Sequence, residues 1–308
     1  MVLAAGNIVE GRYRITELLG RGGMGEVWAA ESLTGDRRVA VKVLLERAAR
    51  KSDIVARFKR EAKVAARIES PFVCALLDTA RTPEGGLALV FEYLHGESLA
   101  DRLRRETDLP WFEVDLIMRD VWQGMADAHD AGVLHRDLKP GNIYLTRCEG
   151  GGERAMILDF GVSKLKKAAR MMDEPSLTAW DGTVGSFAYM APEQVRGAAR
   201  VDERADIYAA GAVAFRALTG HLPFEGVTAK MLVSLKLGRP APTLEEVTGL
   251  RWPKIIEQFF SRTLARGPQQ RFASAREAQA AWQEADEVLR RTRATAARAM
   301  RGGMGPTD

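Results

Sequence analysis

A cluster of glycines near the start of the chain constrains its fold most strongly. Gly20, Gly22 and Gly25 stand at the first, third and sixth places of the cluster, between strand-like stretches at 13–19 and 26–31. Such spacing lets the backbone fold close over phosphate with its N–H groups able to donate. A dinucleotide fold needs a helix directly after the glycines, and a P-loop ends in Gly-Lys-Ser/Thr. Since neither follows, the cluster predicts a turn between antiparallel strands, either a phosphate-covering loop or a plain glycine-rich hairpin.

The remaining pattern divides the chain into a sheet-rich part and a helix-rich part. Further strands are expected at 39–44, 73–79 and 87–93, with one helix from Asp53 to about Ile68. After Leu99 the apolar residues recur mostly at helical spacing, and the main helices are expected at 113–130, 202–218, 255–264 and 275–291. The boundary between the two parts, called the seam below, is expected at residues 92–94. The length of 308 residues fits one two-lobed unit or two small domains.

One strand and one helix of the first part carry a candidate ion pair. In the strand 39–44, alternation places Ala40, Lys42 and Leu44 on one face, where a lysine just after the glycine loop can reach phosphate oxygens. Glu61 shares an apolar helical stripe with Phe58, and a buried glutamate needs a partner. Lys42 is the natural partner, although a solvated strand lysine fits the same pattern.

The stretch from Val133 to Asn142 is the most specific in the chain. It reads Val-Leu-His-Arg-Asp-Leu-Lys-Pro-Gly-Asn and sits between a predicted helix and a short strand. Asp137 can accept a hydroxyl proton, Lys139 can hold a phosphate, and Asn142 can ligate a metal. Asp159 follows another short apolar strand and offers a carboxylate. Two oxygen ligands on neighbouring loops suit Mg²⁺, which binds few protein ligands and takes substrate phosphates for the rest.

Together these motifs resemble the protein kinase catalytic domain, and most of all the eukaryotic-like Ser/Thr kinases of bacteria. The resemblance covers about residues 12–290, and the motifs occur in the order and at the spacing of the family. It implies an α+β, bilobal fold. The N-lobe, residues 1–94, is expected to hold a five-stranded antiparallel sheet and one main helix, and the C-lobe, residues 95–290, to be mostly helical. Residues 291–308 are expected to form a flexible, Arg-rich tail.

The resemblance also implies a role for each matching residue. Gly20, Gly22 and Gly25 would cover the ATP phosphates, and Lys42 would bind them while paired with Glu61. Asp137 would take the acceptor proton, helped by Lys139, and Asn142 and Asp159 would hold Mg²⁺ or Mn²⁺. The residues expected around the adenine are Val27, Ala40, Phe91 as gatekeeper, Glu92, Leu94 and Tyr144.

The activation segment implied by the resemblance ends at Ala191-Pro192-Glu193. Thr178 and Thr183 are its expected phosphorylation sites, because Arg136 precedes the catalytic aspartate. Ser186 stands where the family usually places a threonine that faces the substrate. Glu193 is expected to pair with Arg271, and Asp206 to brace the catalytic loop, the stretch from Val133 to Asn142. The Asp-Leu-Lys-Pro-x-Asn pattern is typical of serine and threonine acceptors.

Composition excludes several other classes. The net charge of +4 is spread over the chain, so no nucleic-acid partner is expected, and the Arg-rich C-terminus is the only feature that points to one. Cys74 and Cys148 stand alone, which argues against zinc and disulfides. The longest apolar run is too short to span a membrane. We expect a cytoplasmic enzyme, alone or as the cytoplasmic part of a longer receptor-like kinase.

The expected partners are ATP, protein substrates and a second copy of the chain for trans-autophosphorylation of the activation loop. Two alternatives share part of the pattern. A pseudokinase usually lacks the equivalents of Lys42, Asp137 or Asp159, whereas this chain has all three. A small-molecule phosphotransferase of related fold lacks the Ala-Pro-Glu segment.

Overall fold

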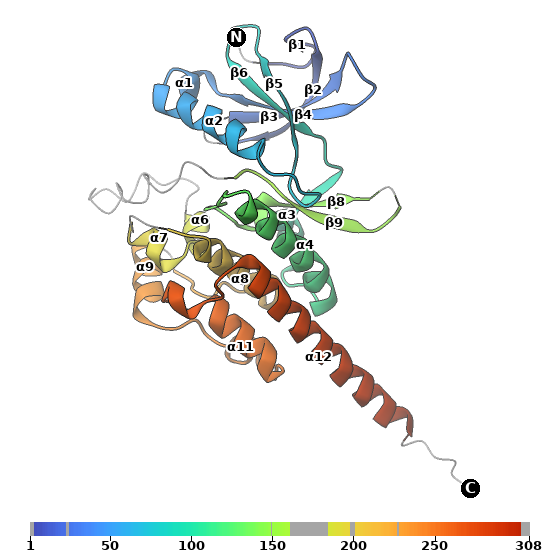
Figure 1. Ribbon diagram of the computed structural model, residues 1–308, viewed down its shortest axis with the longest axis vertical. Helices are drawn as coiled ribbons and strands as arrows, with labels where there is room; N and C mark the ends of the chain where they lie inside the picture. Colours follow the sequence, from blue (N-terminus) through green and yellow to red (C-terminus); the bar gives the residue numbers. More distant parts are fainter. Residues whose placement is uncertain are drawn as a thin grey trace.

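The computed structural model describes residues 3–22, 25–148, 150–160, 184–197, 201–226 and 228–302. Its elements form a sheet-rich lobe followed by a helical lobe, as Figure 1 shows. The expected α+β, two-lobed architecture is therefore confirmed. The chain passes from the first lobe to the second just after Glu92, the last residue of strand β6.

The sheet of the first lobe is antiparallel throughout, with the strand order β1-β2-β3-β4-β6-β5. It contains the five expected strands and adds β1, a two-residue strand at its edge. The strands are β1 (Ile8–Val9), β2 (Tyr13–Arg21), β3 (Gly25–Ser32), β4 (Arg38–Leu44), β5 (Leu76–Arg81) and β6 (Leu87–Glu92).

Alternation along β4 sorts its side chains as the sequence predicts. Val39, Val41 and Val43 are buried in one core cluster with the apolar residues of the neighbouring strands. The opposite face carries Lys42, and it is covered by helix α2 (Ser52–Ala65), which follows the short α1 (Glu46–Ala49). Phe58 of α2 packs there in a separate cluster. The helix thereby holds its other inward-facing residues against the lysine.

The second lobe is built around two long, apolar helices. They are α4 (Trp111–Asp130) and α8 (Arg204–Thr219), and α8 is buried along almost its whole length. The other helices are α3 (Leu99–Glu106), α6 (Val184–Tyr189), α7 (Pro192–Val195), α9 (Ala229–Gly238), α10 (Leu244–Thr248), α11 (Lys254–Thr263) and α12 (Ala275–Gly302), with 3₁₀ turns η1 (Pro140–Asn142) and η2 (Pro268–Gln270).

A small sheet lies on top of the helical lobe and faces the first lobe. Its strands are β7 (Gly96–Ser98), β8 (Ile143–Arg147) and β9 (Glu153–Ile157), paired antiparallel in that order. The stretch from Val133 to Asn142 lies between α4 and β8, and Asp159 follows β9. The sheet therefore brings the two sets of candidate residues to the same side of the helical lobe.

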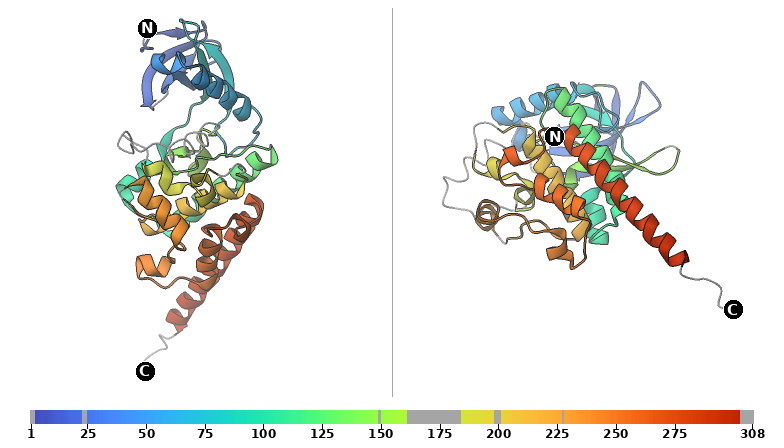
Figure 2. Two further views of the ribbon diagram at one scale, coloured as in Figure 1. Left: turned by 90° about the vertical axis from the view of Figure 1, so that its left-hand side faces the viewer. Right: turned by 60° about the horizontal axis from the view of Figure 1, so that its bottom comes forward.

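Helix α12 differs from the sequence expectation at its end. It runs to Gly302 and extends away from the helical lobe in Figures 1 and 2. Position 291, where the flexible tail was expected to begin, therefore lies inside the helix. Residues 292–301 contain several alanines and arginines and no glycine or proline, so nothing in them stops a helix. Among the described residues, none of the helices combines the length and apolar character needed to cross a membrane.

Candidate active site

The glycine cluster forms the turn between β2 and β3, as the sequence predicts. Gly22 N–H donates to Gly25 O at 2.8 Å, and Gly20 pairs with Val27 across the strands. A Cβ at Gly25 would lie 2.4 Å from the carbonyl oxygen of Val43, so close packing against β4 requires glycine there. A Cβ at Gly20 would meet nothing within 4 Å. Packing of the described residues therefore does not require glycine at position 20, and its expected role over the phosphates stays a prediction.

Lys42 makes the contact that joins the two lobes at the site. Its Nζ donates to Glu61 Oε1 at 2.5 Å and to Asp159 Oδ1 at 2.6 Å, so the predicted pairing with Glu61 is present. The lysine and glutamate side chains are both mostly buried. Burial alone would lower the pKa of Lys42, but the carboxylates of Asp159 and Glu61 outweigh it and raise that pKa. Lys42 is therefore a firmly held cation.

Asp159 owes its position to the residues around it. Its φ is +49°, a left-handed conformation that is uncommon for a residue with a side chain. On one side, Leu158 N–H donates to Asn142 O at 2.9 Å, and Leu158 O lies 2.9 Å from His135 Nε2. On the other, the ring of Phe160 packs 4.8 Å from that of His135. These contacts hold the unusual turn and direct Asp159 toward Lys42.

The three predicted residues of the catalytic loop are in mutual contact. Asn142 Nδ2 donates to the carbonyl oxygen of Asp137 at 2.9 Å and lies 3.4 Å from its Oδ2. Lys139 Nζ lies 3.2 Å from the same Oδ2. A carboxylate with an ammonium and an amide beside it can accept a proton from an alcohol while the ammonium faces an incoming phosphate.

Asp206 fixes the backbone just before Asp137. The buried carboxylate accepts from the N–H groups of His135 at 2.8 Å and Arg136 at 2.7 Å, and it lies 3.0 Å from His129 Nε2. Burial would raise the pKa of Asp206, but hydrogen bonds and the nearby imidazoles lower it overall. The carboxylate therefore stays ionised, and it stabilises the positive φ of Arg136, +65°.

Gln194 is a residue of the site that the sequence analysis missed. Its Oε1 accepts from Ala191 N–H at 3.0 Å, and its Nε2 donates to the carbonyl oxygen of Arg136 at 3.0 Å. The side chain is buried. It thus ties the Ala-Pro-Glu segment to the catalytic loop. A buried glutamine has no sequence signature of its own, and its position just after Glu193 was the available signal.

The residues expected around the adenine lie on strands that meet between the lobes. Val27 pairs with Lys42, and Ala40 pairs with Phe91, so these side chains share the face of the lysine. The hydroxyl of Tyr144 donates to Gly96 O at 2.8 Å. Those positions are half-buried, as are the connecting residues Glu92 and Leu94. Nucleotide contacts at these positions stay a prediction.

The segment after Asp159 is described only in part. Thr178 and Thr183 lie outside the described residues, and Ser186 belongs to α6 with its side chain outside them. The predicted ion pair at the end of the segment is present. Arg271 donates to Glu193 through two nitrogens at 2.7 and 2.8 Å, and the arginine is buried. This forked geometry fixes the end of the segment to the helical lobe.

The donor set fits a metal shared with a nucleotide better than a protein-enclosed metal. Among the described residues, no three His, Cys, Asp or Glu side chains gather as a metal site. The Asn142 amide is oriented by its hydrogen bond to Asp137, and Asp159 has one oxygen on Lys42. One amide and one carboxylate suit Mg²⁺ that takes its other ligands from phosphates and water.

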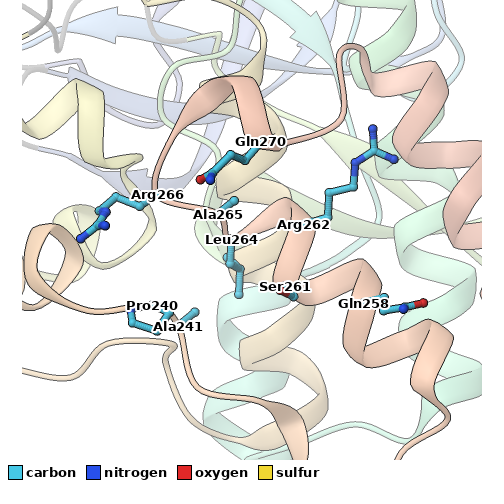
Figure 3. Close-up of a pocket in the computed structure, with 9 residues that line it drawn as sticks. All are labelled: Pro240, Ala241, Gln258, Ser261, Arg262, Leu264, Ala265, Arg266 and Gln270. Atoms are coloured by element: carbon cyan, nitrogen blue, oxygen red, sulfur yellow. The ribbon is translucent and has the colours of Figure 1, made fainter.

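A pocket of about 450 Å³ also lies at the far end of the helical lobe, as Figure 3 shows. It is lined by α11 and by the segments after α9 and α11, including Pro240, Arg262 and Arg266. None of the predicted nucleotide-site residues lines it. It is therefore separate from the site between the lobes.

Comparison with known proteins gives a consistent result. The protein kinase domain model matches residues 13–283. Serine/threonine-protein kinase pkn3 of Myxococcus xanthus is 36% identical over 287 residues, covering 93% of this chain and 52% of that protein. PknJ of Mycobacterium tuberculosis is 36% identical over 89% of the chain and 45% of its own length. The chain therefore spans about half the length of these relatives.

Solved structures show the same similarity in three dimensions. The crystal structure of the Mycobacterium tuberculosis PknI kinase domain superposes with a TM-score of 0.69 at 30% sequence identity. The superposition covers 92% of this chain and 100% of that one.

Proposed function

The chain belongs to the protein kinase domain family, and on that premise we propose that it transfers the γ-phosphoryl group of ATP to serine or threonine hydroxyls of proteins. The observation that carries the proposal is Lys42 held at once by Glu61 and Asp159, 2.5 and 2.6 Å from its Nζ. A lysine that only stabilised the sheet would need no contact with the lobe that bears the catalytic loop.

In the proposed reaction, each charged residue has a separate task. Lys42 binds oxygens of the α- and β-phosphates, and Glu61 holds the lysine in place. Asp137 orients the acceptor hydroxyl and takes its proton. The hydroxyl oxygen forms the new bond to phosphorus as the bond from phosphorus to the β,γ-bridging oxygen breaks, and ADP leaves. Lys139, 3.2 Å from Asp137, balances the charge that gathers on the transferring group.

Mg²⁺ or Mn²⁺ is the implied cofactor, and Asn142 and Asp159 would hold it. When bound, such an ion neutralises phosphate charge and favours one arrangement of the triphosphate. The chain's part is to keep both ligands in place, through the Asn142 contact with Asp137 and the Lys42 contact with Asp159.

The identity of the acceptor is supported by Lys139 in its Asp-Leu-Lys-Pro setting and by relatives named serine/threonine-protein kinases. We further propose that a second copy of the chain serves as one substrate, with Thr178 and Thr183 as acceptors, and that the domain acts in cytoplasmic signalling. Mass spectrometry of the wild type and an inactive variant tests the two threonines. Phosphate missing from both in the active protein contradicts that assignment.

Radioactive ATP and a serine/threonine peptide library test the main proposal. We expect Asp137→Asn to lower kcat by at least about 100-fold, because the acceptor proton loses its base. The matched control is Asp36→Asn, the same substitution at an exposed turn, and it should leave kcat unchanged. Thermal unfolding of both variants separates lost chemistry from lost folding.

Two outcomes would contradict the proposal. A wild type that binds ATP but transfers no phosphate to any protein or peptide would be a binding scaffold. Transfer to small alcohols in preference to peptides would indicate a small-molecule phosphotransferase.

A further inference from the structure

Lys236 of α9 is a buried lysine without a function assigned above. It is 1% exposed, and its Nζ donates to the carbonyl oxygens of Ala188 at 2.8 Å and Met190 at 2.6 Å. Among the residues that the structure describes, it forms no ion pair with a carboxylate. Burying a lysine costs free energy, and a buried lysine is normally paired with a carboxylate. Hydrogen bonds to carbonyl oxygens without such a partner are unusual.

The groups around Lys236 come from three other elements. The ring of Tyr208 on α8 lies 5.1 Å from its Nζ. Arg271, after η2, lies over the same ring, and Glu193 of α7 binds that arginine. Burial, aided by Arg271 and opposed by Glu193, lowers the pKa of Lys236 to about 7.

The two carbonyls belong to the segment between Ser186 and the Ala-Pro-Glu sequence. That segment is also fastened from its other side, because Gln194 joins Ala191 N–H to the carbonyl oxygen of Arg136 in the catalytic loop. Lys236 therefore holds the middle of a short backbone stretch whose end is tied to the catalytic residues. In the proposed function, Ser186 faces the acceptor peptide, and the two held carbonyls follow it within four residues of the chain.

Helix α9 is itself well supported, so Lys236 acts from a fixed base. Its Leu232 packs in a buried cluster with Phe187 and Met190, two side chains of the same stretch as the held carbonyls. At its C-terminal end, Leu237 O accepts from Arg266 at 2.8 Å. Arg266 also lines the pocket of Figure 3, which begins where α9 ends.

We propose that Lys236 is a positioning residue for the acceptor peptide, because it fixes the backbone from Ala188 to Met190 in the shape that the peptide meets. The inference rests on the proposed kinase function. It extends the peptide site from the catalytic loop to α9.

Steady-state kinetics of Lys236→Met tests the proposal. Methionine keeps the length of the side chain and removes its donors, so both carbonyls lose their partner. We expect the peptide KM to rise about tenfold, as the loss of two hydrogen bonds to buried carbonyl oxygens allows. The ATP KM and the hydrolysis of ATP without peptide should change by less than about twofold. The matched control is Lys230→Met, the same change at an exposed position of α9.

Hydrogen exchange measured by mass spectrometry gives a readout that does not depend on activity. Amides of 187–191 should exchange at least about tenfold faster in Lys236→Met than in Lys230→Met, while those of α11 stay alike. If Lys236→Met fails to fold, Lys236→Gln takes its place in both experiments, since it keeps an amide donor without the charge.

The results separate three cases. An unchanged peptide KM in a folded, active variant overturns the inference, and so does an equal loss of peptide phosphorylation and peptide-independent ATP hydrolysis. A wild type that transfers no phosphate defeats the proposed function instead. In that case unchanged exchange at 187–191 would also defeat the anchoring role of Lys236.

Discussion

Lys42 is mostly buried and Lys236 is fully buried, yet their surroundings act on their protons in opposite ways. Lys42 faces two carboxylates, which raise its pKa against the effect of burial. Lys236 faces carbonyls and Arg271, and burial lowers its pKa to about 7. The first residue is therefore a permanent cation suited to phosphate. The second can lose its proton near neutral pH and keep its role as a hydrogen-bond donor.

This difference predicts a pH dependence of stability. Lys236 binds its proton more weakly in the fold than in the unfolded chain, where the pKa is 10.5. Between about pH 7 and 10.5 the unfolded chain therefore binds more protons, and the free energy of unfolding rises with pH. Urea unfolding measures this effect. Between pH 7 and pH 9, the free energy of unfolding of the wild type should rise by about 2 kcal/mol relative to that of Lys236→Met. A difference that is constant over this range would mean that the carbonyls keep Lys236 protonated.

At the scale of elements, α4 and α12 are joined by a reciprocal pair of tryptophans and aspartates. Trp111 of α4 donates to Asp286 of α12, and Trp282 of α12 donates to Asp115 of α4, each at 3.0 Å. The two indole rings stack with centroids 4.8 Å apart. Arg119 binds both carboxylates, so neither buried charge lacks a counterion.

We expect Trp282→Phe to destabilise the protein by about 2 kcal/mol, because a buried N–H bond to a carboxylate is lost while Arg119 still neutralises Asp115. Denaturant unfolding measures the change. Trp252→Phe is the control: its indole is half-buried and its N–H donates to a neutral acceptor, the hydroxyl oxygen Thr248 Oγ1, so the change should cost less than about 1 kcal/mol. Equal costs would show that ring packing, rather than the aspartate bond, holds α12.

The elements that the sequence predicted correctly are those with local signals. The glycine cluster marked the turn between β2 and β3, and the strand period placed Lys42 opposite the valine core. The roles of Lys236 and Gln194 depend on backbone groups between 3 and 58 residues away, as their hydrogen bonds show. No spacing rule detects such contacts. The end of α12 was placed too early because charge was read as a sign of disorder, whereas arginine is also a good helix former.

At the scale of the whole molecule, the largest hydrophobic cluster fills the helical lobe and also takes in Ile68 and Val73 from the segment after α2. This cluster unites α4, α8, α11 and α12 with the small sheet, and it includes Phe160 beside the site. The first lobe holds two smaller clusters, one among its strands and one around Phe58 of α2. Lys42 reaches across to Asp159 between the lobes. The smaller clusters and this polar link imply that the first lobe opens more readily than the second.

Native-state hydrogen exchange should show this difference. We expect amides of β2 and β3 to exchange faster than those of α8, which is buried along nearly its whole length. Mg²⁺ and ATP should slow the exchange of the first lobe and leave α8 nearly unchanged, because the ligand adds contacts only near the seam. In Lys42→Met the effect of the nucleotide should be lost. Equal exchange in both lobes would indicate a single cooperative unit.

The stacked indoles also give the molecule an optical property. Trp111 and Trp282 lie close enough for their excited states to couple, and Trp122 and Trp252 belong to the same lobe. The first lobe contributes Trp28, next to the carboxylate of Glu26. Of the five tryptophans that the structure describes, four lie in the helical lobe, and we expect the near-ultraviolet circular dichroism of the stacked pair to be lost when α12 separates from α4.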